Sequence, residues 1–76
     1  MKPNAEKEQQ QKRLTYLLTP KELEILSHLA NGKLYKEVAI AQGIKIDTVK
    51  KHASTIYRKL QVRNKTEAIL LFHTIR

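Results

Sequence analysis

Residues 47–60 repeat apolar side chains at the spacing of an α-helix, and this segment constrains the fold of the chain most strongly. Its apolar members recur at intervals of four, three and four residues and are Val49, Ala53, Ile56 and Leu60. Residues at these intervals share one face of a helix, which we expect to lie against a protein core. A second set recurs at intervals of four and consists of Lys50, Ser54 and Arg58. That face is polar and basic, and it suits a polar, negatively charged partner.

The length and composition of the chain exclude several classes of protein. Its 76 residues provide one small domain, and a chain this short buries only about 60% of its unfolded surface. The absence of cysteine excludes disulfides and thiolate metal sites and fits a reducing cytoplasm. No apolar run approaches the roughly 20 residues of a membrane span, so we expect no insertion into a membrane.

The charge of the chain indicates a polyanionic partner. The formal net charge is +8, and the isoelectric point is about 10.0. Such a balance is common among proteins that bind DNA, RNA or an acidic membrane surface. A soluble protein with a merely basic surface has the same balance, so the charge favours nucleic acid without identifying it.

The beginning of the chain differs in composition from the rest. Residues 1–13 contain almost no apolar side chain, so burial cannot offset the entropy cost of ordering them. We predict a flexible arm or linker over residues 1–13 and a folded domain over residues 14–76. A linker to an upstream domain is favoured over a basic arm that contacts the DNA backbone.

Helix-start signals divide the folded part into helices. Thr19 is a good N-cap, Pro20 suits the first helical position, and Glu22 completes a capping box. These signals predict a helix over about residues 20–30, which Gly32 ends because glycine accepts the left-handed conformation of a helix C-terminus.

A short helix is expected next, over residues 35–42. A tight turn of residues 43–46, which begins with glycine, separates it from the longer basic helix of residues 46–60. This succession describes a helix-turn-helix, in which the second helix enters the major groove of DNA. Leu34 and Lys45 precede these two helices, and both are poor N-caps.

A fourth helix is predicted from the capping box of Asn64 and Glu67 to about residue 74. Its apolar residues are Ala68, Ile69, Leu70, Leu71, Phe72 and Ile75. This is more apolar surface than one side of a short helix needs. Either part of it packs on a second copy of the chain, or all of it is used inside one small domain.

Several segments together resemble a known family. They are residues 18–26, 36–39, 43–44, 48–52, 58–62 and 64–68. In order and spacing they are similar to the LuxR/FixJ (GerE-like) helix-turn-helix domain, and the similarity covers most of the chain. The resemblance implies an all-α, four-helix domain of a bacterial transcriptional regulator. It also implies sequence-specific binding to double-stranded DNA, in the cytoplasm and associated with the nucleoid.

The resemblance assigns roles to individual residues. Base contacts fall on Lys50, Lys51 and Ser54. Contacts with the DNA backbone fall on Thr48, His52, Arg58 and Lys59. A homodimer interface falls on the fourth helix at Ala68, Ile69 and Phe72. Such domains commonly end response regulators and quorum-sensing receptors, which allows an upstream receiver or sensor domain as a partner, although stand-alone members exist.

Four positions depart from the family pattern. Lys45 stands where serine or threonine is usual, and Leu34 replaces a small polar residue before the second helix. Gln42 replaces a core leucine, and Ile40 stands at a polar place. These departures predict a weakly capped recognition helix. They also predict either a slightly rotated second helix or a glutamine at the edge of the core.

Catalysis and cofactor binding have little support in the sequence. It contains no Gly-rich phosphate loop and no nucleophile with a base and an orienting acid. His28, His52 and His73 lack metal-ligand spacing, so we expect no metal and no cofactor. One alternative function is a protein-interaction module that uses the apolar fourth helix, with DNA binding secondary. A basic helix on anionic membranes fits less well, because the core needs the apolar face of residues 46–60.

Overall fold

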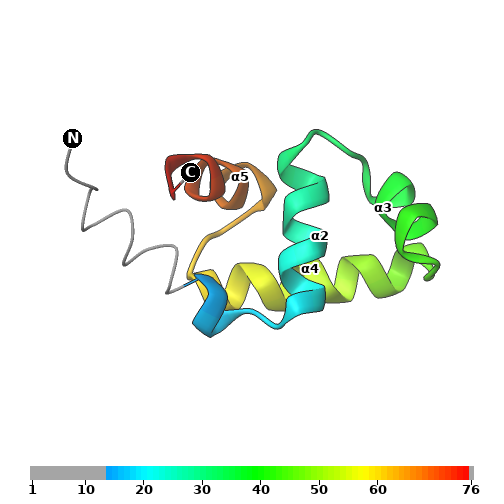
Figure 1. Ribbon diagram of the computed structural model, residues 1–76, viewed down its shortest axis with the longest axis horizontal. Helices are drawn as coiled ribbons and strands as arrows, with labels where there is room; N and C mark the ends of the chain where they lie inside the picture. Colours follow the sequence, from blue (N-terminus) through cyan, green and yellow to red (C-terminus); the bar gives the residue numbers. More distant parts are fainter. Residues whose placement is uncertain (1–13, 76) are drawn as a thin grey trace.

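The computed structural model describes residues 14–75, and over this range the protein consists of helices and their connections. The helices are α2 (Pro20–Ala30), α3 (Tyr35–Gln42), α4 (Ile46–Leu60) and α5 (Lys65–Ile75), and a helical turn at residues 14–17 precedes them (Figure 1). The predicted all-α class and its four helices are confirmed. The arm predicted over residues 1–13 lies outside the described residues, as does residue 76.

The start of α2 confirms the capping box. The backbone N–H of Glu22 donates to Thr19 Oγ1 at 3.1 Å, and the backbone N–H of Thr19 donates to Glu22 Oε1 at 2.9 Å. Pro20 occupies the first turn, where a missing N–H costs no hydrogen bond. Each of these features stabilises the helix end that the sequence predicts.

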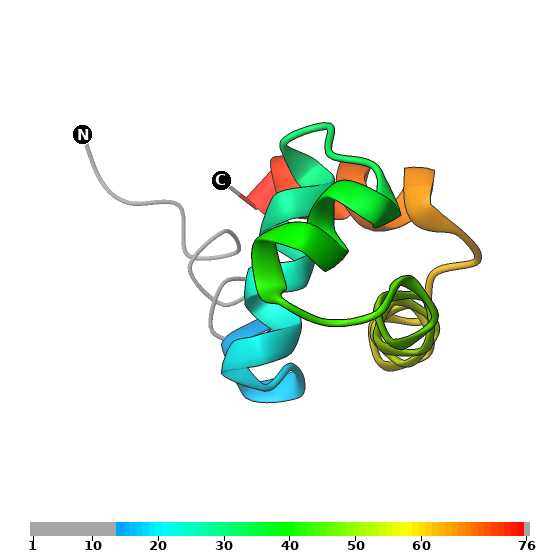
Figure 2. The same ribbon diagram turned by 90° about the vertical axis from the view of Figure 1, so that its right-hand side faces the viewer.

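The core is built around α2. Ile25, Leu26 and Leu29 are fully buried, and each such side chain contributes about 1.5–3 kcal/mol through burial. The other buried members of the cluster come from the remaining helices and from the turn before α2, and they are Leu14, Leu18, Val38, Ala39, Val49, Ile56 and Ala68. In Figures 1 and 2, α2 crosses α4, while α3 and α5 lie on opposite sides of α2.

The turn between α3 and α4 depends on Gly43. Its φ of +65° lies in the left-handed region that favours glycine, and its N–H caps the end of α3 by donating to the backbone of Ile40 and Ala39. α4 then begins at Ile46, after Lys45. Within residues 14–75, the Lys45 side chain makes no capping hydrogen bond, as the sequence predicts. At α3, the Leu34 N–H donates to Glu37 Oε1 at 2.8 Å, which replaces part of the missing cap.

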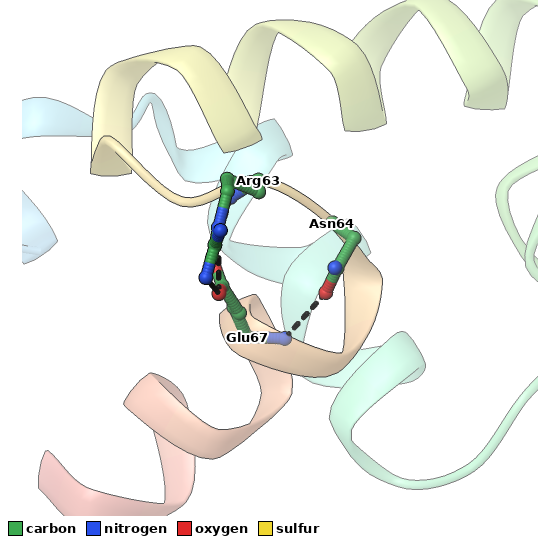
Figure 3. Close-up of polar contacts among 3 residues, drawn as sticks. All are labelled: Arg63, Asn64 and Glu67. Carbon is green, nitrogen blue, oxygen red and sulfur yellow. Dashed lines mark hydrogen bonds and ion pairs between the residues drawn. The ribbon is translucent and has the colours of Figure 1, made fainter.

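The passage from α4 to α5 combines a left-handed residue with a second cap. Gln61 ends α4 with φ of +57°, although it is not a glycine. At the start of α5 the Glu67 N–H donates to Asn64 Oδ1 at 2.9 Å, which confirms Asn64 as the N-cap (Figure 3). The second bond of the predicted capping box differs, because the Glu67 carboxylate accepts the backbone N–H of Arg63 instead of that of Asn64. The carboxylate of Glu67 also accepts from the Arg63 backbone and guanidinium at 2.7–3.1 Å, and these bonds hold its pKa below the ordinary value.

Gln42 is half-buried at the boundary of the core, which is one of the two alternatives that its replacement of a leucine left open. Its side-chain nitrogen lies 3.1 Å from His28 Nε2. Its Oε1 is buried and has no hydrogen-bond partner among the described residues. Ile40, two residues earlier on α3, is 79% exposed, which agrees with the polar character usual at its position.

Candidate nucleic-acid interface

α4 carries the candidate interface because its two sides have opposite environments. Val49, Ala53 and Ile56 are each at most 1% exposed, and they anchor the helix to the core. Figure 2 looks along the axis of α4 and shows α2 and α3 on one side of it, with the other side turned outward. The outward side of α4 is therefore free to meet a partner over the length of the helix.

The predicted base-contacting residues lie on this outward side. Lys50, Lys51 and Ser54 are all exposed, and so is Arg58 one turn beyond Ser54. Intervals of three and four residues place these side chains on adjoining rows of one face. The structure therefore brings two ammonium groups, a hydroxyl and a guanidinium onto a single surface of α4.

Thr48 and His52 lie beside that surface. Both are half-buried, and their interval of four residues places them on one flank of α4. Each retains partial access to solvent next to the exposed lysines. The structure thus groups both residues with the outward face, at its edge.

Lys59 lies on the same flank, but its ammonium group has a protein partner. Lys59 Nζ donates to Glu22 Oε1 at 2.8 Å, and Glu22 is 5% exposed. Burial raises the pKa of the Glu22 carboxyl, but the hydrogen bonds from Lys59 and Thr19 outweigh burial, so the pKa lies below its ordinary value. Lys59 therefore joins the C-terminal end of α4 to the first turn of α2.

A second set of polar contacts fixes the opposite flank of α4. The hydroxyl of Tyr57 lies 2.8 Å from that of Tyr35, the first residue of α3. Burial and the Tyr35 hydroxyl raise the pKa of Tyr57. The ammonium of Lys65, the first residue of α5, lies 5.3 Å from the centre of the Tyr35 ring, within the range of a cation–π interaction. These contacts connect α3, α4 and α5.

The predicted dimer residues differ in how much surface they offer. Ala68 is fully buried in the core cluster, so its side chain has no surface to present to a second copy. Ile69 and Phe72 are half-buried, and Phe72 packs against the core. Leu70, which was not selected from the sequence, is 62% exposed. The apolar surface of α5 is therefore centred on Leu70 and its half-buried neighbours.

Two further observations concern metal sites and membrane spans. Among residues 14–75, no group of three or more histidine, cysteine, aspartate or glutamate side chains is arranged to hold a metal ion. In the same described range, none of the helices combines the length and the apolar character needed to cross a membrane.

Sequence reasoning did not find the partners of Lys59 or Tyr57. Glu22 lies on the same side of α2 as Ile25, Leu26 and Leu29, at helical intervals. A carboxylate on an apolar face needs a cationic partner when it is buried. That pattern signals a buried ion pair, although it does not identify a partner 37 residues away.

Comparisons with known proteins agree with this geometry. The model of the family described as bacterial regulatory proteins, luxR family, matches residues 16–72. The uncharacterized transcriptional regulatory protein YhcZ of Bacillus subtilis is 46% identical over 55 residues, which cover 72% of this chain and 26% of that protein. No solved structure matches the chain significantly.

Response regulators are also among the relatives. The response regulator protein VraR of Staphylococcus saprophyticus is 43% identical over 61 residues, which cover 80% of this chain and 29% of that protein. VraR of Staphylococcus aureus strain Mu3 is 44% identical over 54 residues, which cover 71% of this chain and 26% of that protein. The chain therefore spans less than a third of the length of these curated relatives.

Proposed function

Because this chain belongs to the luxR family of bacterial regulatory proteins and carries its helix-turn-helix, we propose that it regulates transcription by placing α4 in the major groove of DNA. The observation that carries this proposal is the exposed basic face of α4, opposite a fully buried one. The 15 residues of α4 extend for roughly 22 Å at 1.5 Å per residue, and a major groove about 12 Å wide admits an α-helix.

We assign two kinds of contact to this face. Lys50, Lys51 and Ser54 contact base edges, since lysine donates to guanine O6 and N7 and a serine hydroxyl both donates and accepts. Thr48, His52 and Arg58, at the edge and the far end of the face, contact the DNA backbone. These contacts set the register of the helix on the duplex.

Lys59 receives a different assignment from its neighbours. Its ammonium group is paired with the buried carboxylate of Glu22, and release to a phosphate leaves that carboxylate unpaired. We therefore assign Lys59 to holding α4 in place rather than to a backbone contact.

We further propose that two copies bind DNA together through α5. Leu70, Ile69 and Phe72 provide the apolar surface, while Ala68 supports it from within the core. Isologous pairing of identical helices matches two DNA half-sites related by two-fold symmetry. The same apolar surface supports the alternative function, a protein-interaction module in which DNA binding is secondary.

Two relatives support a proposal on the place of the domain in the cell. Two of them are named response regulators, and the chain covers less than a third of each. We propose that the domain acts in the cytoplasm at the nucleoid, as the output of an upstream receiver or sensor domain.

The proposal is tested by the salt dependence of DNA binding. A duplex is first selected from random double-stranded DNA, and its affinity is measured by fluorescence anisotropy between 50 and about 200 mM salt, a range over which phosphate contacts dominate the change. We expect log K to fall with log salt at roughly −0.9 per phosphate neutralised. Arg58→Ala should reduce the slope by about one.

The control is Lys33→Ala, which removes the same charge from the loop between α2 and α3. That loop lies at the end of α2 far from α4 (Figure 1), so the slope should stay unchanged. A flat salt response of the unmodified protein would contradict the proposal. DNA binding that survives the combined change of Lys50 and Lys51 to alanine would contradict the assignment of this face of α4 to the base contacts. An unmodified protein that binds no selected duplex would favour the protein-interaction alternative.

A further inference from the structure

Ile46 is an apolar side chain at the first position of α4, and it is 40% exposed. The other β-branched apolar residues of this helix, Val49 and Ile56, are fully buried. Ile46 does not belong to the core cluster. Its position in the fold therefore does not explain an isoleucine there.

The position of Ile46 on α4 relates it to the proposed DNA contacts. Residues 46, 50, 54 and 58 follow one another at intervals of four, so Ile46 begins the row that continues with Lys50, Ser54 and Arg58. A side chain in an α-helix leans toward the N-terminus, which carries Ile46 to the leading end of this row. In helix-turn-helix proteins the N-terminal residues of the recognition helix contact base edges.

The major groove offers an isoleucine one apolar group, the C5 methyl of thymine. We propose that Ile46 contacts a thymine methyl and so adds a thymine to the sequence that the protein recognises. This inference rests on the proposed function, because it requires α4 to lie in the major groove.

The position of that thymine follows from helix geometry. Four residues along an α-helix correspond to roughly 6 Å, and successive bases on one strand are about 3.4 Å apart. The thymine therefore lies within about two base pairs of the base contacted by Lys50. Ile40 is not part of this row of residues, because it lies on α3, where it is 79% exposed.

The experiment replaces thymine by deoxyuridine, which lacks the C5 methyl and keeps the same hydrogen bonds. Each thymine of a duplex selected from random DNA is replaced in turn, and the affinity of the unmodified protein is measured. We expect a loss of about fourfold at one position per half-site, which corresponds to one buried methyl group. The Ile46→Ala variant should bind the thymine and deoxyuridine duplexes equally.

Ile40→Ala serves as the matched control, because it removes the same atoms from a more exposed isoleucine. It should keep the fourfold preference for thymine. The base pair at which Lys50→Ala changes the sequence preference is the one that Lys50 contacts. Thermal unfolding of each variant verifies that the variant is folded.

The outcomes separate the two levels of the proposal. Salt-dependent, sequence-specific binding without any loss at a deoxyuridine position would overturn the role of Ile46 and leave the proposed function intact. The role of Ile46 would also be overturned if Ile46→Ala kept the preference for thymine. The same conclusion would follow if the selected DNA contained no thymine near the base whose recognition depends on Lys50. Failure to select any DNA sequence would overturn the proposed function, and the role of Ile46 with it.

Discussion

The ammonium group of Lys59 and the carboxylate of Glu22 form an ion pair of 2.8 Å between the last turn of α4 and the first turn of α2. The same oxygen, Glu22 Oε1, accepts the backbone N–H of Thr19 in the capping box. One carboxylate oxygen therefore stabilises the start of one helix and the placement of another.

Glu22→Gln should lower the free energy of unfolding by about 1 kcal/mol, because the amide keeps an acceptor but loses the charge that Lys59 pairs with. Chemical denaturation measures this change. Glu24→Gln, at an exposed position of α2, is the control and should change stability by less than about 0.5 kcal/mol. Equal effects of the two changes would show that the ion pair contributes nothing.

The ion pair also predicts a dependence on pH. The pKa of Glu22 is lowered in the folded protein from its ordinary value of 4.5, so its contribution is complete above about that pH. The contribution disappears as the pH falls through the folded pKa. Above pH 4.5 the native protein should exceed Glu22→Gln in stability, and the difference should vanish in more acidic solution.

Contacts with bases and contacts with the backbone should produce different losses. Lys51→Ala or Ser54→Ala should alter preference at one base pair by roughly 1–3 kcal/mol, because a base edge loses its partner. Arg58→Ala should weaken binding to all sequences about equally. Binding to a selected duplex and to its single-base-pair variants separates these patterns. A uniform loss for all three changes would refute the base-contact assignment.

Leu70→Glu should weaken the binding of two copies to DNA and leave the stability of the folded domain nearly unchanged. The reason is that Leu70 is 62% exposed, so its side chain contributes little to the core. We expect a larger loss of affinity for DNA with two half-sites than for DNA with one. Phe72 and Ala68 are less suitable for this test, since both pack against the core. Leu34→Glu is the control, because it introduces the same charge at a 56% exposed leucine outside α5. Similar losses on both duplexes would argue against an α5 interface.

Lys45→Ser should stabilise the domain by supplying the N-cap that α4 lacks. Replacing a poor cap by serine contributes about 1 kcal/mol, which raises the melting temperature by about 4–8 °C in a domain of this size. Thermal unfolding measures the shift. Lys51→Ser places the same residue inside α4, where it cannot cap and should lower stability by a few tenths of a kcal/mol. A decrease with Lys45→Ser would mean that the lysine stabilises the turn in another way.

The sequence predicted the features that depend on nearby residues. The caps at Thr19 and Asn64, the absence of one at Lys45, and the apolar face of α4 follow from patterns within a few residues. Such features depend on backbone geometry, which neighbouring residues determine.

Contacts between distant segments could not be predicted in this way. The partner of Lys59 lies 37 residues earlier in the chain, and that of Tyr57 lies 22 residues earlier. The family resemblance placed a dimer interface on α5 and included Ala68, without indicating which of its apolar residues the core buries. Its burial depends on where α2 and α4 lie, which helix periodicity does not determine.

The contact between α5 and α2 has a consequence for folding. His73 Nε2 donates to the carbonyl oxygen of Ala30 at 2.9 Å, across 43 residues of chain. Together with the burial of Ala68, this bond places the last helix against the first, while the helix-turn-helix lies between them in the sequence. A fragment limited to α3 and α4 lacks Ile25, Leu26 and Leu29 and should not hold its shape in isolation. The surface of α4 therefore forms only in a cooperative transition that involves nearly the whole domain, and a single proteolytic cut that releases α5 should abolish it.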